Sequence, residues 1–380
     1  MIESPAIVIP VYRRLGHLQE LLSSLEKADY GDKQIPLVFK THQGVSNEVL
    51  SFCKAYKWTH GNKTVIKDEE QLQLDENLRR CADLSEQFGS VIILEDDSYV
   101  SPRYYQYALA VLALPSDDRI AQFSLYRYGF NAISGLPHEI PDDEYDAFFI
   151  QKTSTRGQLF TWQQWKAFRE WLQDMPGPDK RLPEYIHSFG LNNWELQHNW
   201  FLIEQDKYVL SPKLSVVSNQ GPSGVHHTSN IDSGYFQAAL QIHPRSWRLP
   251  SFQQSQLKYD AYFEIEPAFF TALNEYDFVT DLNGHKPVEI LGNAHTLTSK
   301  TASKSLIGYS MGLKPLEINI LWENHGNDIR LCATRDLVKD VKSRRLWNAR
   351  QYFAHVPDVG VVNFLRHKWL KYVERRKGSK

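Results

Sequence analysis

The first 95 residues alternate short apolar runs with segments in which apolar residues recur at helical spacing. The apolar runs lie at residues 6–9, 37–39, 64–66 and 91–94. Short β-branched runs of this kind are typical of strands buried on both faces of a parallel sheet, and the intervening segments are typical of amphipathic helices. Four strands separated by three helices predict right-handed βαβ crossovers and an α/β protein with a doubly wound, mostly parallel sheet.

Capping residues locate the starts of two helices. Ser46 suits the N-cap position of the helix after the second strand, with Glu48 in its first turn. After the fourth strand, Ser101 can cap a helix whose first position is Pro102 and which we expect to continue to about Leu112. The residues between that strand and that helix are therefore expected to sit on a rigid frame.

The bulk composition is that of an ordinary globular protein. The chain has 380 residues with a formal charge of −2, which gives no argument for nucleic-acid binding over the whole surface. Its three cysteines are widely spaced and predict neither a disulfide framework nor a zinc site. We see no signal peptide and no apolar run of about 20 residues, so we expect a cytoplasmic protein.

Three consecutive carboxylates, Glu95, Asp96 and Asp97, directly follow the fourth apolar run. Ligands of doubly wound sheets bind at the carboxyl ends of the strands, which is where this triplet is expected to lie. Adjacent carboxylates repel one another, and a divalent cation such as Mg²⁺ or Mn²⁺ relieves that repulsion while bridging them to a substrate diphosphate. The competing interpretation is an ordinary polar turn after a strand.

Three stretches together resemble the GT-A glycosyltransferases. They are IPVYRR at residues 9–14, EDD at 95–97 and VxPxYYxY at 100–107. The likeness is greatest to the branch containing N-acetylglucosaminyltransferase I, and it extends to bacterial family 2-like polysaccharide glycosyltransferases. It covers roughly residues 5–228, so it implies a Rossmann-like GT-A catalytic domain over residues 1–228.

The resemblance also implies an activity and the roles of the acidic triplet. The implied reaction is a metal-dependent, inverting transfer of a hexosyl or N-acetylhexosaminyl group from a nucleotide sugar, with a UDP-sugar favoured, to a glycan or lipid-linked acceptor. Asp97 is then the ligand of the Mn²⁺ or Mg²⁺ ion that holds the donor diphosphate. Asp96 faces the donor ribose or sugar, and Glu95 lies close to the donor sugar. Bacterial surface polysaccharide synthesis is the implied setting.

Further donor-binding positions follow from the same resemblance. Pro10 and Tyr12 belong to the stretch after the first strand, where Arg13 matches a phosphate-contacting arginine and Arg14 stands beside it. A solvated helix start is the competing interpretation, although cations there oppose the helix dipole. His42 stands where the family has an acidic residue that reads the base, and this departure leaves the base open.

The catalytic base is the next implied residue, because an inverting transfer needs a carboxylate to take the proton of the acceptor hydroxyl. Glu195, in the stretch NWEL at 193–196, is the candidate, and a surface glutamate on a helix is the alternative. His226 and His227 follow a Gly-Pro-Ser-Gly loop that could cover the donor. His226 is the candidate metal ligand of the two, with a solvated loop histidine as the alternative.

The rest of the chain has a different character. Residues 229–360 are expected to form an accessory α+β region with a hairpin near 315–333. Residues 361–380 combine apolar positions at helical spacing with many Lys and Arg side chains, which is typical of a basic amphipathic helix on an anionic membrane. Such a helix would place the enzyme at the inner face of the membrane; the alternative is a terminal helix docked on its own domain.

Two other functions remain open from the sequence. A nucleotidyltransferase shares α/β sheets and acidic metal ligands, but it usually opens with a Gly-rich loop that residues 10–14 lack. A non-catalytic glycan-binding protein would use the aromatic residues between 126 and 200 to stack on sugars.

Overall fold

The computed structural model describes most of the chain in two compact units. The described residues are 4–178, 181–187, 190–220, 236–292, 294–338, 365 and 369. The larger unit contains the described parts of Met1–Arg127, Asp142–Asn219 and Ala238–Ile265. The smaller unit contains those of Tyr128–Pro141, Gln220–Gln237 and Glu266–Lys380. The main division therefore falls near residue 265, whereas the sequence places it near residue 228.

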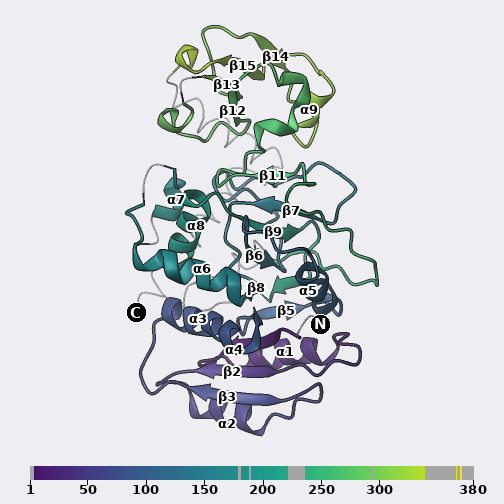
Figure 1. Cartoon of the computed structure of the whole chain (residues 1–380), viewed down its shortest axis with the longest axis vertical. Helices are drawn as coiled ribbons and strands as arrows, with labels where there is room; N and C mark the ends of the chain where they lie inside the picture. The colour runs from purple at the N-terminus through teal and green to yellow at the C-terminus, as the bar shows by residue number, and fades with distance from the viewer. Residues whose placement is uncertain are drawn as a thin grey trace. The chain divides into compact units, whose positions relative to one another are not determined.

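The larger unit is built on one nine-stranded mixed sheet. Its strands are β1 (Ala6–Pro10), β2 (Leu37–Thr41), β3 (Lys63–Lys67), β4 (Ser90–Ile93), β6 (Ile120–Ser124), β7 (Ala147–Ile150), β8 (Gln158–Thr161), β9 (Tyr208–Pro212) and β11 (Lys258–Tyr259). The order across the sheet is β11-β7-β9-β6-β8-β4-β1-β2-β3 (Figure 1). The run β3-β2-β1-β4 is parallel, whereas β8 pairs antiparallel with both β4 and β6. The α/β class with a parallel-rich sheet is thus confirmed.

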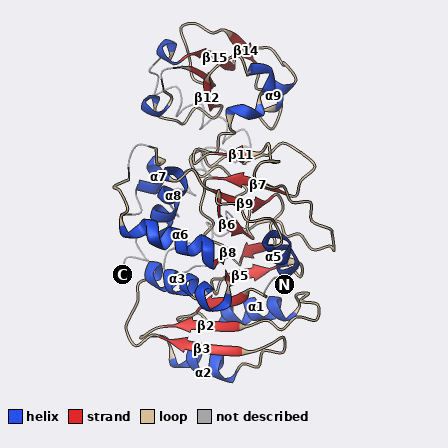
Figure 2. Ribbon diagram, in the orientation of Figure 1, coloured by secondary structure: helices blue, strands red, loops and turns tan. Residues whose placement is uncertain are grey.

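The larger unit also contains helices, most of which pack against this sheet. They are α1 (Leu15–Glu26), α2 (Asn47–Ala55), α3 (Leu74–Asp83), α4 (Ser85–Phe88), α5 (Tyr104–Leu112), α6 (Trp162–Gln173), α7 (Glu184–His187) and α8 (Trp194–Glu204). Figure 2 shows α3, α6 and α8 to one side of the strands and α1 and α5 to the other. A separate two-stranded sheet joins β5 (Ser98–Val100) to β10 (Val217–Asn219). All residues of β1, β2 and β4 are buried, as expected for strands covered on both faces.

One of the two capping predictions is confirmed, and the one for Ser101 is wrong, because the N-cap residue of α5 is Arg103. The Ser46 hydroxyl accepts a hydrogen bond from the Val49 amide at 3.2 Å, which confirms it as the N-cap of α2. Helix α5 begins at Tyr104, two residues later than expected. The Ser101 hydroxyl instead accepts from the Arg103 amide at 3.0 Å, in the turn that leads into the helix.

The smaller unit has a four-stranded sheet of its own. Its strands are β12 (Phe278–Asp281), β13 (His295–Thr298), β14 (Ile307–Tyr309) and β15 (Ile329–Ala333), in the order β12-β13-β15-β14. The predicted hairpin near 315–333 is wrong in its first arm, because helix α9 (Ile318–Leu321) lies where that strand was expected. Buried Asn319 explains this turn, since its side-chain amide donates to the carbonyl oxygens of Leu313 and Leu316 at 2.9 and 3.0 Å.

The C-terminal prediction mostly lies outside the described residues. Of 361–380, only Leu365 and Trp369 are described; both are helical, and both are more than half exposed. Within the described segments, no helix is both long enough and apolar enough to cross a bilayer.

Candidate functional site

Three parallel strands end beside one another and deliver charged and aromatic residues to one edge of the sheet. Strand β1 ends at Pro10, β2 ends just before His42, and β4 ends at Ile93, two residues before Glu95. Because β1 pairs in parallel with both β2 and β4, these three ends share one edge. The structure therefore brings together the stretches that the sequence singled out at 10–14, 42 and 95–97.

Arg14 binds the acidic triplet. Its Nη1 lies 3.0 Å from Asp97 Oδ2, and its Nε lies 3.2 Å from Asp96 Oδ2. Arg14 Nη2 also forms an ion pair with Asp96 Oδ1, so the guanidinium grips both oxygens of Asp96. The side chains of Arg14, Asp96 and Asp97 are 30%, 8% and 19% exposed. The carboxylates are thus partly neutralised by the guanidinium of the N-cap residue of α1.

Burial and the neighbouring charges shift the pKa values of two carboxyl groups in the triplet. Burial, followed by the charge of Asp97, raises the pKa of Glu95 to about 8, while Arg156 and Arg14 oppose the shift. Burial also raises the pKa of Asp96, and the Arg14 guanidinium opposes that rise. Arg156 lies in the loop between β7 and β8, where no periodic pattern in the sequence marks it. It is a charged neighbour of the site that the sequence did not predict.

Tyr12 and His42 form an aromatic pair beside the charges. Their rings stack with centroids 4.9 Å apart and planes 18° apart, and the Arg13 guanidinium lies 4.6 Å from the Tyr12 ring centre. His42 Nδ1 lies 3.3 Å from the amide nitrogen of Leu72, which fixes the ring. Gly44 has φ +90°, a backbone conformation that favours glycine, and a Cβ there would lie 3.2 Å from the Tyr12 hydroxyl. A glycine at this position therefore lets the backbone pass close to the Tyr12 ring. Arg13 is therefore placed on an aromatic ring, whereas Arg14 is placed on the carboxylates.

A network of ion pairs around the buried Lys40 supports the end of β2. Lys40, whose side chain is 4% exposed, forms an ion pair with Asp68, and Arg80 Nη1 lies 3.5 Å from the other Asp68 oxygen. Arg80 also bonds Glu70 at 2.5 Å and Glu76 at 3.1 Å. Because the Glu70 carbonyl accepts from the Gln43 amide at 3.0 Å, this network holds the loop that carries His42.

Glu195 lies in the first turn of α8 and forms an ion pair with Lys152. The Lys152 side chain is 3% exposed and that of Glu195 is 20% exposed, so the carboxylate is the partner that reaches solvent. The Asn193 side chain caps the helix by accepting from the Leu196 amide at 3.0 Å. The sequence makes Glu195 a candidate base but does not predict its cation, because Lys152 is 43 positions away.

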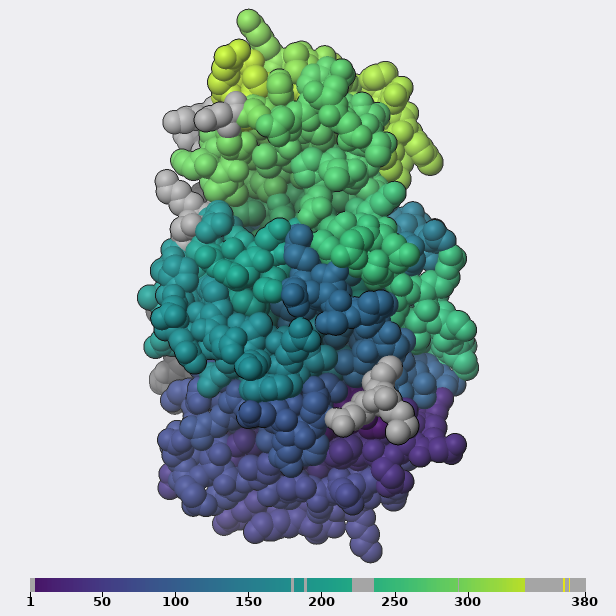
Figure 3. All heavy atoms as spheres, viewed as in Figure 1, coloured from purple at the N-terminus to yellow at the C-terminus, as the bar shows by residue number. Residues whose placement is uncertain are grey.

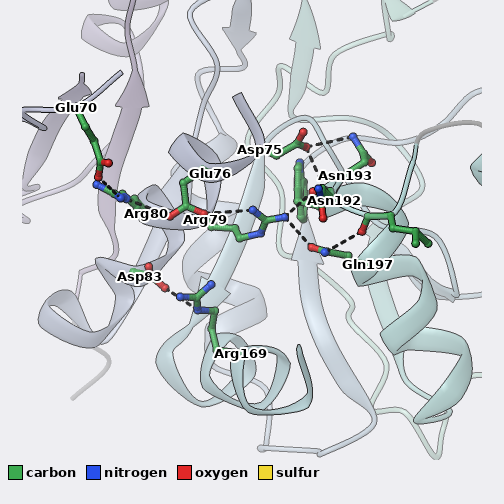
Figure 4. Close-up of polar contacts among 12 residues, drawn as sticks. Glu70, Asp75, Glu76, Arg79, Arg80, Asp83, Arg169, Asn192, Asn193 and Gln197 are labelled. Atoms are coloured by element: carbon green, nitrogen blue, oxygen red, sulfur yellow. Dashed lines mark hydrogen bonds and ion pairs between the residues drawn. The ribbon is translucent and has the colours of Figure 1, made fainter. Parts of the chain in front are cut away.

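Polar side chains of α3 join the start of α8 to the parallel half of the sheet (Figure 4). Asp75 accepts from Asn193 Nδ2 and from the Trp194 amide, both at 3.1 Å. Arg79 donates to the Asn192 carbonyl at 2.7 Å. In Figure 3 the teal surface of residues near 160–200 adjoins the blue surface of the N-terminal segments. Helix α3 therefore fixes the helix that carries Glu195, and the sequence predicts none of these contacts.

The donor chemistry of the triplet fits a hard divalent cation only in part. Carboxylate oxygens are the protein ligands that Mg²⁺ and Mn²⁺ prefer, and such ions usually take one or two of them and complete their shell with phosphate and water. Within the described ranges, no group of three or more His, Cys, Asp or Glu side chains is placed to hold a metal ion. Asp96 and Asp97 are the pair available at this edge, and His226 and His227 lie outside the described residues.

A cleft of about 530 Å³ lies elsewhere in the larger unit. Gly89, just before β4, and Asp118, just before β6, line it. Since these residues precede their strands, the cleft lies at the opposite edge from the triplet. The size of a cleft does not by itself indicate a reaction. We therefore place the functional site at the edge where β1, β2 and β4 end, which carries the arginines and the carboxylates.

Comparison with known proteins yields structural similarity only. No protein-family model and no curated protein matches the chain. Similar solved structures include S. aureus TarS 1-349 in complex with UDP-GlcNAc (13% identity, TM-score 0.37, covering 58% of this chain and 59% of that one). Another is the Pyrobaculum calidifontis mannosyltransferase PcManGT in complex with GDP-Man and Mn²⁺ (14%, 0.33, 56% and 59%). A third is GalNAc-T7 with UDP, GalNAc and Mn²⁺ (13%, 0.36, 55% and 42%).

The alignments therefore span about three fifths or less of those chains. With TM-scores below 0.5, these similarities do not decide what this chain does.

Proposed function

We propose that this chain is a GT-A-type, metal-dependent glycosyltransferase. It transfers a hexosyl or N-acetylhexosaminyl group from a nucleotide sugar, with a UDP-sugar favoured, to a glycan or lipid-linked acceptor, and it inverts the anomeric centre. The supporting observation is the edge where β1, β2 and β4 end together. An aromatic pair, two arginines and three carboxylates meet there, and a nucleoside diphosphate needs such a combination of stacking surface, positive charge and metal ligands.

Asp97, with Asp96 beside it, is assigned to hold the divalent cation. When bound, Mn²⁺ or Mg²⁺ supplies positive charge to the diphosphate leaving group. Asp97 is the more exposed of the two carboxylates, which suits the direct ligand. Asp96 and Glu95 are assigned to the donor ribose and sugar, and Tyr12 and His42 to the base.

The chain's own residues carry the remaining steps. Glu195 accepts the acceptor's hydroxyl proton as that oxygen attacks the anomeric carbon and the carbon–oxygen bond to the diphosphate breaks. Lys152 contacts Glu195 Oε1, and we assign Oε2 to take the proton. Arg13 and Arg14 are assigned to the negative charge that develops on the departing diphosphate, where preorganised cations stabilise the transition state.

The biological setting follows from the same proposal. An acceptor carried on a lipid would lie at the inner face of a bacterial membrane, and a basic C-terminal helix would keep the enzyme there. Surface polysaccharide synthesis is the corresponding process. Liposome flotation with and without residues 361–380 tests the membrane step, and equal flotation would remove it.

A donor panel tests the activity itself. Thermal unfolding is measured with UDP- and GDP-sugars, each with and without Mn²⁺, because a ligand that binds only the folded protein raises its melting temperature. We expect a UDP-sugar to give the largest shift, and only with Mn²⁺. Slow Mn²⁺-dependent release of nucleoside diphosphate should accompany it. If no nucleotide sugar shifts the melting temperature, the proposed function is wrong.

A further inference from the structure

Arg14 sits where its charge opposes the backbone. It is the N-cap residue of α1, a helix of 12 residues, and the Leu18 amide donates to its carbonyl oxygen at 3.1 Å. No acidic residue lies in the first turn of α1. The positive end of a helix dipole disfavours a cation, so Asp96 and Asp97 must compensate for this placement. An anion at the same helix end would be favoured instead.

The guanidinium and a divalent cation need the same oxygens. Arg14 already uses both oxygens of Asp96 and Oδ2 of Asp97. A metal ion on these carboxylates would place two positive groups side by side, which is unfavourable in a partly buried site. Metal binding to both carboxylates therefore competes with Arg14 for these oxygens.

The Arg14 side chain is exposed enough to move, but it needs a new partner. Its side chain is 30% exposed, against 8% for Asp96. Displacement by metal alone would leave the guanidinium without its two carboxylates at the positive end of α1. A diphosphate arriving at that end would accept the guanidinium through charge-assisted hydrogen bonds, because Arg matches phosphate geometry.

We propose that Arg14 is a built-in competitor of the divalent cation and thereby makes metal and nucleoside diphosphate bind as a pair. Without nucleotide, Arg14 holds Asp96 and Asp97 and keeps metal affinity low. With nucleotide, the diphosphate takes Arg14 and releases the carboxylates to the metal. This inference rests on the proposed function, which identifies the diphosphate as part of a nucleotide. The metal and the nucleotide should each raise the protein's affinity for the other by the same factor.

Mn²⁺ titration followed by electron paramagnetic resonance tests the competition without any turnover. Free Mn²⁺ is measured for the wild type, Arg14→Gln and Lys27→Gln, each with and without UDP. In the wild type we expect UDP to tighten Mn²⁺ binding about 5–150-fold, the usual range of coupling between two ligands. In Arg14→Gln we expect Mn²⁺ alone to bind about tenfold tighter than in the wild type, with most of the coupling lost.

Lys27→Gln is the matched control. It removes the same charge from an exposed side chain at the other end of α1, where Lys27 is the C-cap residue. It should therefore change Mn²⁺ affinity only slightly and leave the coupling in place. Arg14→Lys, which keeps the charge but not the forked contact, should fall between Arg14→Gln and the wild type.

The outcomes separate this inference from the proposed function. If Arg14→Gln, folded by circular dichroism, binds Mn²⁺ alone no tighter than Lys27→Gln, the competition is refuted; undetectable binding by both counts as the same result. If Arg14→Gln does not fold, the comparison of Arg14→Lys with Lys27→Gln decides in the same way. If UDP and other nucleoside diphosphates bind no variant while Arg14→Gln still binds Mn²⁺ tighter, the competition stands and the nucleotide-sugar function fails.

Discussion

The two halves of the nine-stranded sheet hold their functional side chains differently. In the parallel half, β1 to β4, the site residues follow directly on the strand ends, and neighbouring strands bring them together. In the mixed half, β6 to β9 with β11, Glu195 lies on a helix and depends on partners far away in sequence. Lys152 is 43 positions from it, and Asp75 reaches the helix start from 119 positions away. In the parallel half, the pairing of neighbouring strands is enough to bring the site residues together. In the mixed half, the position of Glu195 depends on individual contacts between residues that are far apart in sequence.

Asp97→Ala should have the largest effect, because it removes a ligand that the parallel half supplies. We expect a loss of transfer of about a thousandfold or more, together with loss of metal-dependent UDP binding. Transfer assays and UDP titration with and without Mn²⁺ measure the two effects. The control is Asp32→Asn, an exposed carboxylate before β2 and so at the other edge of the sheet. Transfer by Asp97→Ala at the wild-type rate would remove the acidic edge from the mechanism.

Glu195→Gln tests the mixed half in the same assay. Loss of a general base typically costs about 10²–10⁴-fold in turnover, and donor binding should be retained because the parallel half holds the donor. Steady-state kinetics and donor titration separate the two. Glu170→Gln on α6, also exposed, should behave as the wild type. A loss below about tenfold would move the base to another residue.

His198 makes the stability of the mixed half depend on pH. Burial, followed by the nearby Lys152 charge, lowers the pKa of His198 to about 3, against about 6.5 for an exposed histidine. Since the folded form resists protonation, stability is full above pH 6.5 and is lost as pH falls from 6.5 toward 3. At pH 5.5 the contribution should be about 1.4 kcal/mol smaller than at neutral pH.

Urea unfolding between pH 7.5 and 4.5 measures this dependence. His198→Gln is expected to be less stable at neutral pH, because His198 Nδ1 contacts the Thr153 hydroxyl at 2.8 Å. Its disadvantage should shrink as the pH falls, because glutamine does not titrate. A constant difference between the two proteins across this range would show that His198 titrates normally in the folded state.

Asn193→Ala should have the smallest effect and tests whether the cap positions Glu195. Losing an N-cap costs about 1 kcal/mol, and here it also breaks the contact with Asp75. We expect a lower kcat with little change in the KM for the donor, because the donor is held elsewhere. The double variant Asp75→Ala/Asn193→Ala should be less damaging than the sum of its single variants, since the two residues share a contact. Strict additivity would contradict the connection through α3.

The sequence predicts the parallel half well for a physical reason. Strands buried on both faces need continuous apolar runs, and Ser46 acts through residues three positions away, so both signals are local. It could not predict Lys152, Arg156 or Asp75 as site neighbours, because nothing near each residue records a partner more than 40 positions distant. The hairpin prediction failed similarly: the apolar spacing of 315–322 favoured a strand, but buried Asn319 stabilises a helical turn.

The proposed role of Asp97, four residues after the end of β4, is to hold a cation that binds the donor diphosphate. The most direct measurement is anomalous diffraction at the manganese edge from crystals grown with Mn²⁺ and UDP. We expect a manganese peak within bonding distance of an Asp97 oxygen, with the diphosphate on its far side and Arg14 turned from Asp96 to phosphate. Nucleotide and metal bound in the cleft beside Gly89, with Arg14 still on Asp96 and Asp97, would contradict the account.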